Sequence, residues 1–274
     1  MVKWIRYLSL DVAAGASIMM AFTASVFEVS IDLVYYFLLF LMTWLIYTTD
    51  HLMDARNIPH EASTPRHRFH QMYYRPILSA AIIGLFVFIG LIPRETTELL
   101  FRLGLGLAGL VLLYFLSLIW ARKTQFRYVL KEVFIAFCYT AGVALVPAYL
   151  DWPLSPMNWV FLMVIFLLAL GNVFIFSLRE MKFDLHDEHP SAIRFLGQNT
   201  LKTITALVLW MACGLNVYIT LAGTISVGLC FLSMNNVLLL LYYFPSYFQQ
   251  KEWYRILGDG VFLMPVLYLM FRYF

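Results

Sequence analysis

The sequence is poor in charged residues and in cysteine, and each scarcity excludes a class of protein. Only 13% of the 274 residues are charged, whereas 62% are hydrophobic and the mean hydropathy is +0.78. A soluble core cannot bury that much apolar surface. The three cysteines, Cys138, Cys213 and Cys230, lie in apolar runs without CxxC spacing, which argues against a disulfide framework or a cysteine zinc site. The composition therefore predicts an integral membrane protein.

Long apolar runs divide the chain into membrane-spanning segments. A helix needs about 20 apolar residues to cross a bilayer, and these runs do not alternate as strands of a barrel would. The first run follows Lys3 and Arg6 as in a signal peptide, but because eight more runs follow we expect it to be retained. We predict an all-α polytopic membrane domain over residues 1–274, with nine transmembrane helices at about 8–27, 32–49, 76–93, 99–119, 130–149, 157–177, 201–219, 223–244 and 255–273.

The basic residues are distributed unevenly among the predicted loops. Of the 19 Lys and Arg residues, all but Arg94, Arg102 and Arg272 fall near the N-terminus or in alternate loops. The positive-inside rule then predicts a multi-pass protein of the cytoplasmic (inner) membrane, with the N-terminus cytoplasmic and the C-terminus outside. The acidic loops at about 50–75 and 178–200 would face the cytoplasm. Because topology and anionic lipid explain the basic pI, we expect no nucleic-acid partner.

Acidic side chains gather in these two loops. Asp50 and Asp54 lie four residues apart, so they share one face if the helix continues. Glu180, Asp184 and Asp187 repeat the helical spacing at i, i+4 and i+7. Stacked carboxylates repel one another unless cations or protons neutralise them, and oxygen ligands beside Lys and Arg suit Mg²⁺ that carries a substrate's phosphates. We therefore predict a metal site, with solvated charges that fix the topology as the open alternative.

The histidines suggest a competing metal chemistry. His67-x-x-His70 and His186-x-x-His189 are similar in spacing to the histidine boxes of membrane di-iron oxidases. Those families use more histidines in denser boxes, so a His-ligated di-iron oxidase is the weaker hypothesis. The surrounding Pro and Arg residues favour a polar loop for His67 and His70. His51 and His186 lie within the carboxylate clusters and are the accessory candidates.

The number of helices and the positions of the two polar stretches resemble the UbiA superfamily of intramembrane prenyltransferases, over essentially the whole chain. Members of that family have nine transmembrane helices, a cytoplasmic N-terminus, an NDxxDxxxD motif after the second helix and a DxxxD-type motif after the sixth. In an alignment of the first motif, Asp50 takes the Asn position and Asp54 the central Asp. His51 and Ile58 replace the first and the last Asp. The resemblance implies a UbiA-like helical bundle.

The remaining matches are consistent with an enzyme of that family. Glu180 and Asp184 take the two positions of the second motif, Arg68 matches a basic residue downstream of the first, and Lys131 matches the start of the fifth helix. The resemblance implies Mg²⁺-dependent ionisation of a polyprenyl diphosphate and transfer of the prenyl group to a hydrophobic acceptor, preferably an aromatic one. It assigns catalysis to Asp50, Asp54, Glu180 and Asp184, metal binding to these four and Asp187, and diphosphate binding to Arg68, Lys131 and Lys182.

The departures from the first motif leave two questions open. Replacement of two acidic positions by His51 and Ile58 removes hard ligands. His51 then either coordinates a softer divalent metal or forms a hydrogen bond to phosphate. The same departure motivates a second function, because a scaffold does not fix chemistry. In that alternative the chain is a non-catalytic membrane subunit that binds a lipid, quinone or pigment, or packs in a larger complex.

Overall fold

The computed structural model describes residues 2–58, 60–93, 96–120, 128–186, 192–249 and 252–273, and within these ranges it contains helices and no strands. The elements are α1 (Val2–Tyr7), α2 (Leu10–Val26), α3 (Leu33–Asn57), α4 (Pro65–Met72), α5 (Tyr74–Leu91), α6 (Glu98–Trp120), α7 (Tyr128–Leu150), α8 (Pro156–His186), α9 (Ala192–Leu196), α10 (Gln198–Ala222), α11 (Ile225–Tyr243), α12 (Pro245–Phe248), α13 (Trp253–Gly260), the 3-10 turn η4 (Val261–Leu263) and α14 (Pro265–Tyr273).

The prediction of an all-α, multi-pass membrane protein is confirmed. Eight helical segments of the described chain are long and apolar enough to span a bilayer. Helix α2 is shorter, at 17 residues, and coincides with the first predicted span. The last predicted span is covered by α13, η4 and α14 together, and Pro265 begins the final piece. A proline at the first helical position loses no helical hydrogen bond, which explains this placement. The helix number is thus consistent with nine spans.

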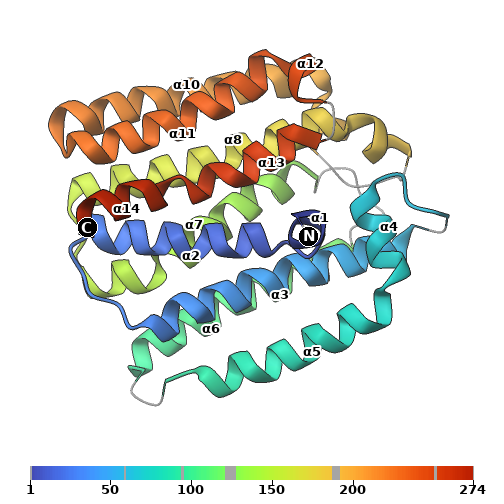
Figure 1. Cartoon of the computed structure of the whole chain (residues 1–274), viewed down its shortest axis with the longest axis horizontal. Coiled ribbons are helices and arrows are strands. Elements are labelled where there is room, and N and C mark those ends of the chain that lie inside the picture. The colour runs from blue at the N-terminus through green and yellow to red at the C-terminus, as the bar shows by residue number, and fades with distance from the viewer. Residues whose placement is uncertain are drawn as a thin grey trace.

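The long helices lie side by side as one bundle (Figure 1). Helices α10 and α11 form one edge, α3, α5 and α6 form the other, and α8, α2 and the α13–α14 segment lie between them. Helix α8 is central, because 72% of its most apolar window is buried, more than in any other described span. The outer helices α5 and α6 instead expose Phe86, Leu112 and Leu113. Exposed apolar side chains on a spanning helix are the surface expected to face lipid.

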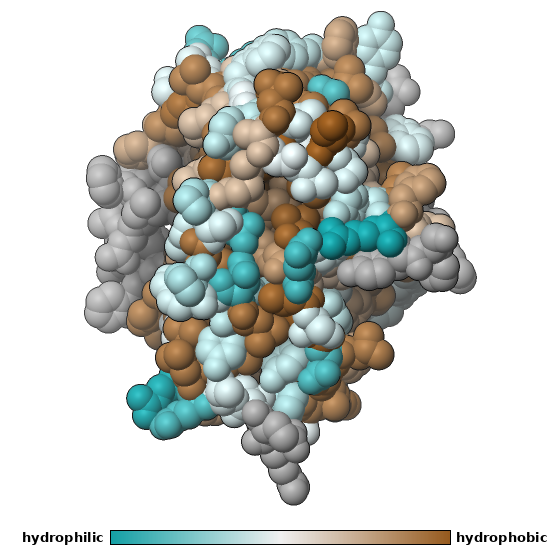
Figure 2. Space-filling view, turned by 90° about the vertical axis from the view of Figure 1, so that its left-hand side faces the viewer, coloured by the Kyte–Doolittle hydropathy of each residue, from teal (hydrophilic) through white to brown (hydrophobic). Residues whose placement is uncertain are grey.

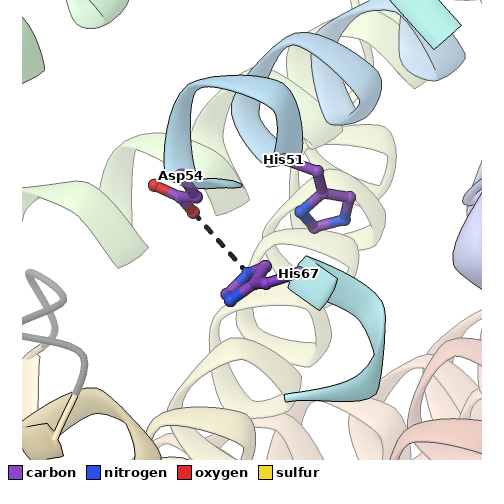
Figure 3. A group of neighbouring side chains, drawn as sticks. All are labelled: His51, Asp54 and His67. Atoms are coloured by element: carbon purple, nitrogen blue, oxygen red, sulfur yellow. Dashed lines mark ion pairs between the residues drawn. The ribbon is translucent and has the colours of Figure 1, made fainter. Parts of the chain in front are cut away.

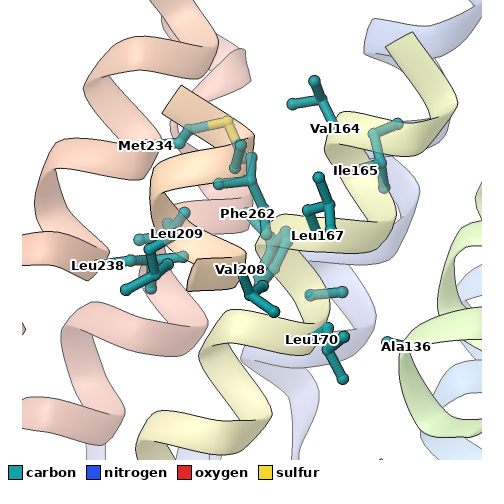
Figure 4. Close-up of a cluster of buried hydrophobic side chains, with 14 of the residues drawn as sticks. Ala136, Val164, Ile165, Leu167, Leu170, Val208, Leu209, Met234, Leu238 and Phe262 are labelled. Carbon is teal, nitrogen blue, oxygen red and sulfur yellow. The ribbon is translucent and has the colours of Figure 1, made fainter. Parts of the chain in front are cut away.

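The core is packed around α8. Val164, Ile165 and Leu167 of this helix belong to one buried cluster with side chains of α11 and η4, among them Met234 and Phe262 (Figure 4). Helices α8 and α10 approach closely at Gly171, where an added Cβ would lie 2.7 Å from the Leu209 Cδ2 atom. Small residues allow such close approach between membrane helices. This packing fixes the position of α8, which carries part of the second acidic stretch.

The two predicted acidic loops are largely helical. Helix α3 continues past residue 49 to Asn57, and α8 continues past residue 177 to His186. A separate helix, α4, forms where a loop was expected, and it begins with Thr64 as N-cap and Pro65 at the first position. The apolar runs end earlier than the helices because the polar ends pack against neighbouring helices rather than against lipid. The spacing that stacks Asp50 above Asp54 is therefore realised.

Both ends of the bundle carry polar side chains. Figure 2 looks onto the end that faces left in Figure 1, where hydrophilic residues lie among hydrophobic ones. Helix α4 and the end of α3 lie at the opposite, right-hand end (Figure 1). The first predicted acidic cluster therefore occupies one end of the bundle, as a site at a membrane surface requires. Which end faces the cytoplasm remains a prediction.

Candidate functional site

Helix α4 turns three polar side chains inward. Arg66, His67 and His70 are all buried, and the Nδ1–H group of His70 donates to the Arg66 carbonyl oxygen at 2.9 Å. The connection to α3 is held by Gln71, whose Oε1 atom accepts from the Ala62 N–H at 3.0 Å and whose Nε2 atom donates to the His60 carbonyl oxygen at 2.9 Å. His67 and His70 are thus part of a packed helix and not of the polar loop that the sequence favoured.

The inward face of α4 meets α3 in a group of three potential ligands. His51 and Asp54 come from α3 and His67 from α4, and one donor atom of each lies within 4.8 Å of the others (Figure 3). The His67 Nε2 atom lies 3.9 Å from the Asp54 Oδ2 atom. The His51 ring also lies close to His70, with 5.1 Å between the ring centroids. Sequence reasoning assigned His51 and Asp54 to the site, whereas it favoured a polar loop for His67.

A first charged group joins α3 to α7. We call it the α3/α7 group, and it consists of Asp50, Asp54, Lys131 and Glu132. The Lys131 ammonium interacts electrostatically with all three carboxylates. The Glu132 side chain is buried, and its Oε1 atom accepts from the Ala192 N–H of α9 at 2.6 Å. The structure thus brings Lys131 to the two aspartates of the first motif, as their predicted roles require.

A second charged group joins α8, α4 and α13. We call it the α4/α13 group, and it consists of Arg66, Glu180, Arg255 and Asp259. Glu180 forms an ion pair with Arg255, and its Oε1 atom accepts from the Tyr254 hydroxyl at 3.0 Å. The Arg66 Nη2 atom lies 4.0 Å from the Asp259 Oδ2 atom. Both oxygens of Glu180 are therefore already engaged by side chains of α13.

The two groups are electrostatically connected, and the first of them is acidic. Tyr47 of α3 interacts with Asp50 of the first group and with Arg66 and Asp259 of the second. Among the described residues, Lys131 faces three carboxylates, whereas Arg66 and Arg255 balance the two carboxylates of the second group. Carboxylates thus outnumber basic side chains in the α3/α7 group. Buried carboxylates in excess attract cations or protons.

Burial and neighbouring charge also act on the titratable groups of α4. Burial lowers the pKa of Arg66 below its usual value, and the positive charge of Arg255 lowers that pKa further. Burial likewise lowers the pKa of His70, with a smaller contribution in the same direction from the Arg66 charge. The hydrogen bond from His70 to the Arg66 carbonyl oxygen opposes this shift but does not reverse it. His70 is therefore neutral near pH 7, whereas an arginine retains its proton.

A cavity of about 270 Å³ lies between α2, α3, α6 and α7, with Asp50 at its polar end. Its lining is otherwise almost wholly apolar and aromatic, and the rings include Tyr47, Tyr114, Phe134 and Tyr139. The volume is slightly below the roughly 300–1,000 Å³ typical of ligand pockets. The cavity thus connects an aromatic interior to the acidic α3/α7 group.

The other predicted residues lie apart from these groups or outside the described side chains. Arg68 is half-exposed and pairs with Glu61 at 2.9 Å, and Lys182 is exposed. Asp184 and His186 lie in the last turns of α8, but their side chains are outside the described part of the chain, and Asp187 lies outside the described residues altogether. Their predicted roles remain predictions.

Sequence reasoning missed the buried cations Arg66 and Arg255, and also Asp259, the partner of Arg66. One local signal was available for Arg66. Thr64 followed by Pro65 is a helix start, and a helix from there places residues 66, 67 and 70 on one face. No local signal identified Arg255, because its partner Glu180 lies on another helix far away in the sequence.

Comparison with known proteins bears on the fold. The sequence matches no protein-family model and no curated protein. A similar solved structure is described as the apo structure of a UbiA homolog from Aeropyrum pernix K1, with a TM-score of 0.65 and 14% sequence identity. The match covers 95% of this chain and 98% of that chain. The chain therefore has the fold of a UbiA homolog, and the UbiA-like helical bundle implied by the sequence resemblance is confirmed.

Proposed function

We propose that the protein is a UbiA-like prenyltransferase that ionises a polyprenyl diphosphate and transfers the prenyl group to a hydrophobic acceptor, preferably an aromatic one. The observation that carries this proposal is the position of Asp50 at the polar end of an aromatic cavity. An isoprenoid diphosphate has the complementary shape and chemistry, with an apolar chain and an anionic head. The fold of a UbiA homolog is consistent with this assignment.

The cavity side chains would bind the chain and protect the reacting carbon. Apolar residues from α3, α6 and α7 exclude water, which would otherwise capture an allylic cation. The rings of Tyr47, Tyr114 and Phe134 lie in the lining, and aromatic faces stabilise positive charge by cation–π interaction. The acceptor would enter the same cavity, since its lining favours a hydrophobic molecule.

The anionic head would lie at the α3/α7 group. Lys131 would neutralise diphosphate oxygens, and the excess of carboxylates around it suits a divalent cation. Asp50 and Asp54 would hold Mg²⁺, which typically uses one or two protein carboxylates together with substrate phosphates. Bound Mg²⁺ would stabilise the negative charge of the leaving diphosphate. Glu180 is the weaker ligand candidate, because Arg255 and Tyr254 already engage its oxygens.

Release of diphosphate tests the proposal. Purified protein in lipid nanodiscs is incubated with Mg²⁺ and radiolabelled polyprenyl diphosphates of several chain lengths, and released diphosphate is counted. We expect release by the wild type and a loss of about 10²-fold or more in Asp50→Asn, on the scale of a lost electrostatic contact to the reacting group. Glu98→Gln, which removes an exposed carboxylate at the start of α6, is the matched control and should leave the rate unchanged. Absence of release at every chain length contradicts the proposal.

The contacts of Glu180 with Arg255 and Tyr254 favour a second candidate function. If the second motif serves only to join α8 to α13, the chain is a membrane subunit that binds a lipid, quinone or pigment in the same cavity without turning it over. The protein would then co-purify with a bound hydrophobic molecule or with stable partner subunits. Lipid extraction and mass spectrometry of the purified protein distinguish the two, because an enzyme should instead consume added diphosphate substrate.

A further inference from the structure

The tautomer of His51 follows from its contact with Arg66. The His51 Nε2 atom lies 3.1 Å from the Arg66 Nη1 atom, and both side chains are more than nine-tenths buried. A guanidinium group donates hydrogen bonds and has no acceptor. Nε2 must therefore accept, which requires a lone pair on that nitrogen. A neutral imidazole with a lone pair on Nε2 carries its hydrogen on Nδ1.

The Nδ1–H group of His51 is an unsatisfied donor. The Nδ1 atom is buried, and no described residue forms a hydrogen bond with it. Figure 3 shows one ring nitrogen of His51 on the side of Asp54 and His67, and the other turned away from them. Since Nε2 faces Arg66, the nitrogen on the Asp54 side is Nδ1. Buried donors in native proteins almost always have a partner, so the position calls for a ligand that accepts a hydrogen bond.

The contact with Arg66 decides between an anion and a metal as that ligand. A metal on Nδ1 would need the lone pair there and would move the proton to Nε2, against an N–H group of Arg66. An anionic oxygen accepts directly from Nδ1–H and leaves the contact with Arg66 intact. The adjacent Asp54 carboxylate interacts with Lys131 and lies beside His67, which reduces its repulsion of an anion.

We propose that His51 is a neutral hydrogen-bond donor to a diphosphate oxygen, and that Arg66 is the positioning residue that fixes its tautomer. This inference rests on the proposed function and adds a substrate-binding residue to it. At the place where the resemblance puts an acidic metal ligand, the chain has a direct contact to the anion. The head group would then be held partly by a metal at Asp50 and Asp54 and partly by an N–H group.

Pyrophosphate binding with two replacements of His51 tests the proposal. The probe is inorganic pyrophosphate with Mg²⁺, titrated by calorimetry into the full chain in nanodiscs. His51→Asn places an amide N–H near the position of Nδ1–H, whereas His51→Leu has no donor. We expect His51→Leu to weaken binding about tenfold or more, as for a lost hydrogen bond to a charged group, and His51→Asn to stay within about threefold of the wild type. Equal weakening in both variants, or none in either, overturns the proposal.

Nitrogen NMR of the histidine rings tests the role of Arg66 without any ligand. With ¹⁵N-labelled histidine, His51, assigned by its absence in His51→Asn, should show Nδ1 protonated and Nε2 unprotonated in the wild type. In Arg66→Gln the side-chain amide can donate or accept, so the Nε2–H tautomer should become populated. Cooperative thermal unfolding shows whether Arg66→Gln is folded. If the variant does not fold, the wild-type spectrum alone determines the tautomer of His51. An Nε2–H tautomer in the wild type overturns the assignment.

Binding of a metal ion by His51 and His67 is the alternative outcome. Co²⁺ added to the wild type should give no visible absorption that depends on both His51 and His67, and such absorption overturns the proposal in favour of a histidine-ligated metal. Absence of pyrophosphate binding by the wild type also overturns it. The diphosphate-release assay separates this failure from failure of the proposed function, because turnover can persist without a contact from His51.

Discussion

Replacement of Arg255 should destabilise the protein strongly, because it leaves a buried carboxylate without its counter-ion. Arg255 and Glu180 each have side chains only 12% exposed, and the Arg255 guanidinium also lies 5.5 Å from the centre of the Phe176 ring. In Arg255→Leu the remaining side-chain donor to Glu180 among the described residues is the Tyr254 hydroxyl. Loss of one partner from a buried pair costs about 3–5 kcal/mol.

A double substitution separates the effect of the two charges on stability from the effect of side-chain packing. Arg255→Leu with Glu180→Leu removes both charges, and replacement of a buried pair by apolar residues is often nearly neutral. We expect the double variant to be more stable than Arg255→Leu, although it has lost one more polar group. Arg102→Leu is the control, because Arg102 and Glu98 form an exposed pair on α6. An exposed pair of that kind contributes about 0–1 kcal/mol.

The assay is reversible unfolding in mixed micelles, with increasing SDS and with tryptophan fluorescence as the readout. Free energies of unfolding are compared for the wild type, both single variants and the double variant. If Arg255→Leu lowers the free energy of unfolding by less than about 1 kcal/mol, Arg255 and Glu180 are not a buried pair that neutralise each other. A double variant as unstable as the sum of its single variants refutes it as well, since coupled residues are not additive.

Two further predictions concern the packing and the ionisation of the bundle. Because the pKa of His70 is lowered in the folded protein, protonation favours the unfolded chain. The free energy of unfolding should therefore fall as the pH drops below about 6.5, the ordinary histidine pKa. His70→Gln should show a smaller fall between pH 7.5 and 5.5 in thermal unfolding; an unchanged fall would contradict the assignment. Gly171→Ala should lower the free energy of unfolding by about 1–3 kcal/mol, because the new Cβ overpacks against Leu209. Gly214→Ala is the control and should not lower it, because no atom lies within 4 Å of the new Cβ. Equal unfolding midpoints for the two alanine variants would contradict the close approach of α8 and α10.

The fold was predictable because it depends on the length and polarity of continuous segments. A span needs about 20 apolar residues, and this requirement located the start of every long helix within a few residues, and the end of every long helix except α3 and α8. The ends of α3 and α8 were not predicted, since their polar last turns are stabilised by contacts with α4, α7 and α13 rather than by hydropathy. Hydropathy alone does not show the break between α13 and α14, because the apolar run is continuous across η4.

Two kinds of evidence predicted parts of the site, namely the spacing of residues near one another in sequence and the family resemblance. The spacing of Asp50 and Asp54 placed them on one face, and the family resemblance brought Lys131 to them. Arg66 and Asp259 meet only because α4 folds back beside α13, and nothing in either segment encodes that contact. The choice between a metal ligand and a donor for His51 likewise depends on Arg66, fifteen residues away.

Photo-crosslinking of a substrate analogue shows whether the aromatic cavity with Asp50 at its end holds a polyprenyl diphosphate. The wild-type chain in nanodiscs is irradiated with a polyprenyl diphosphate that carries a diazirine on its chain, and the modified peptides are identified by mass spectrometry. We expect label on α3, α6 and α7, competed by inorganic pyrophosphate with Mg²⁺ and reduced in Asp50→Asn but not in Glu98→Gln. Label confined to α10 and α11, or label unaffected by Asp50→Asn, would contradict it.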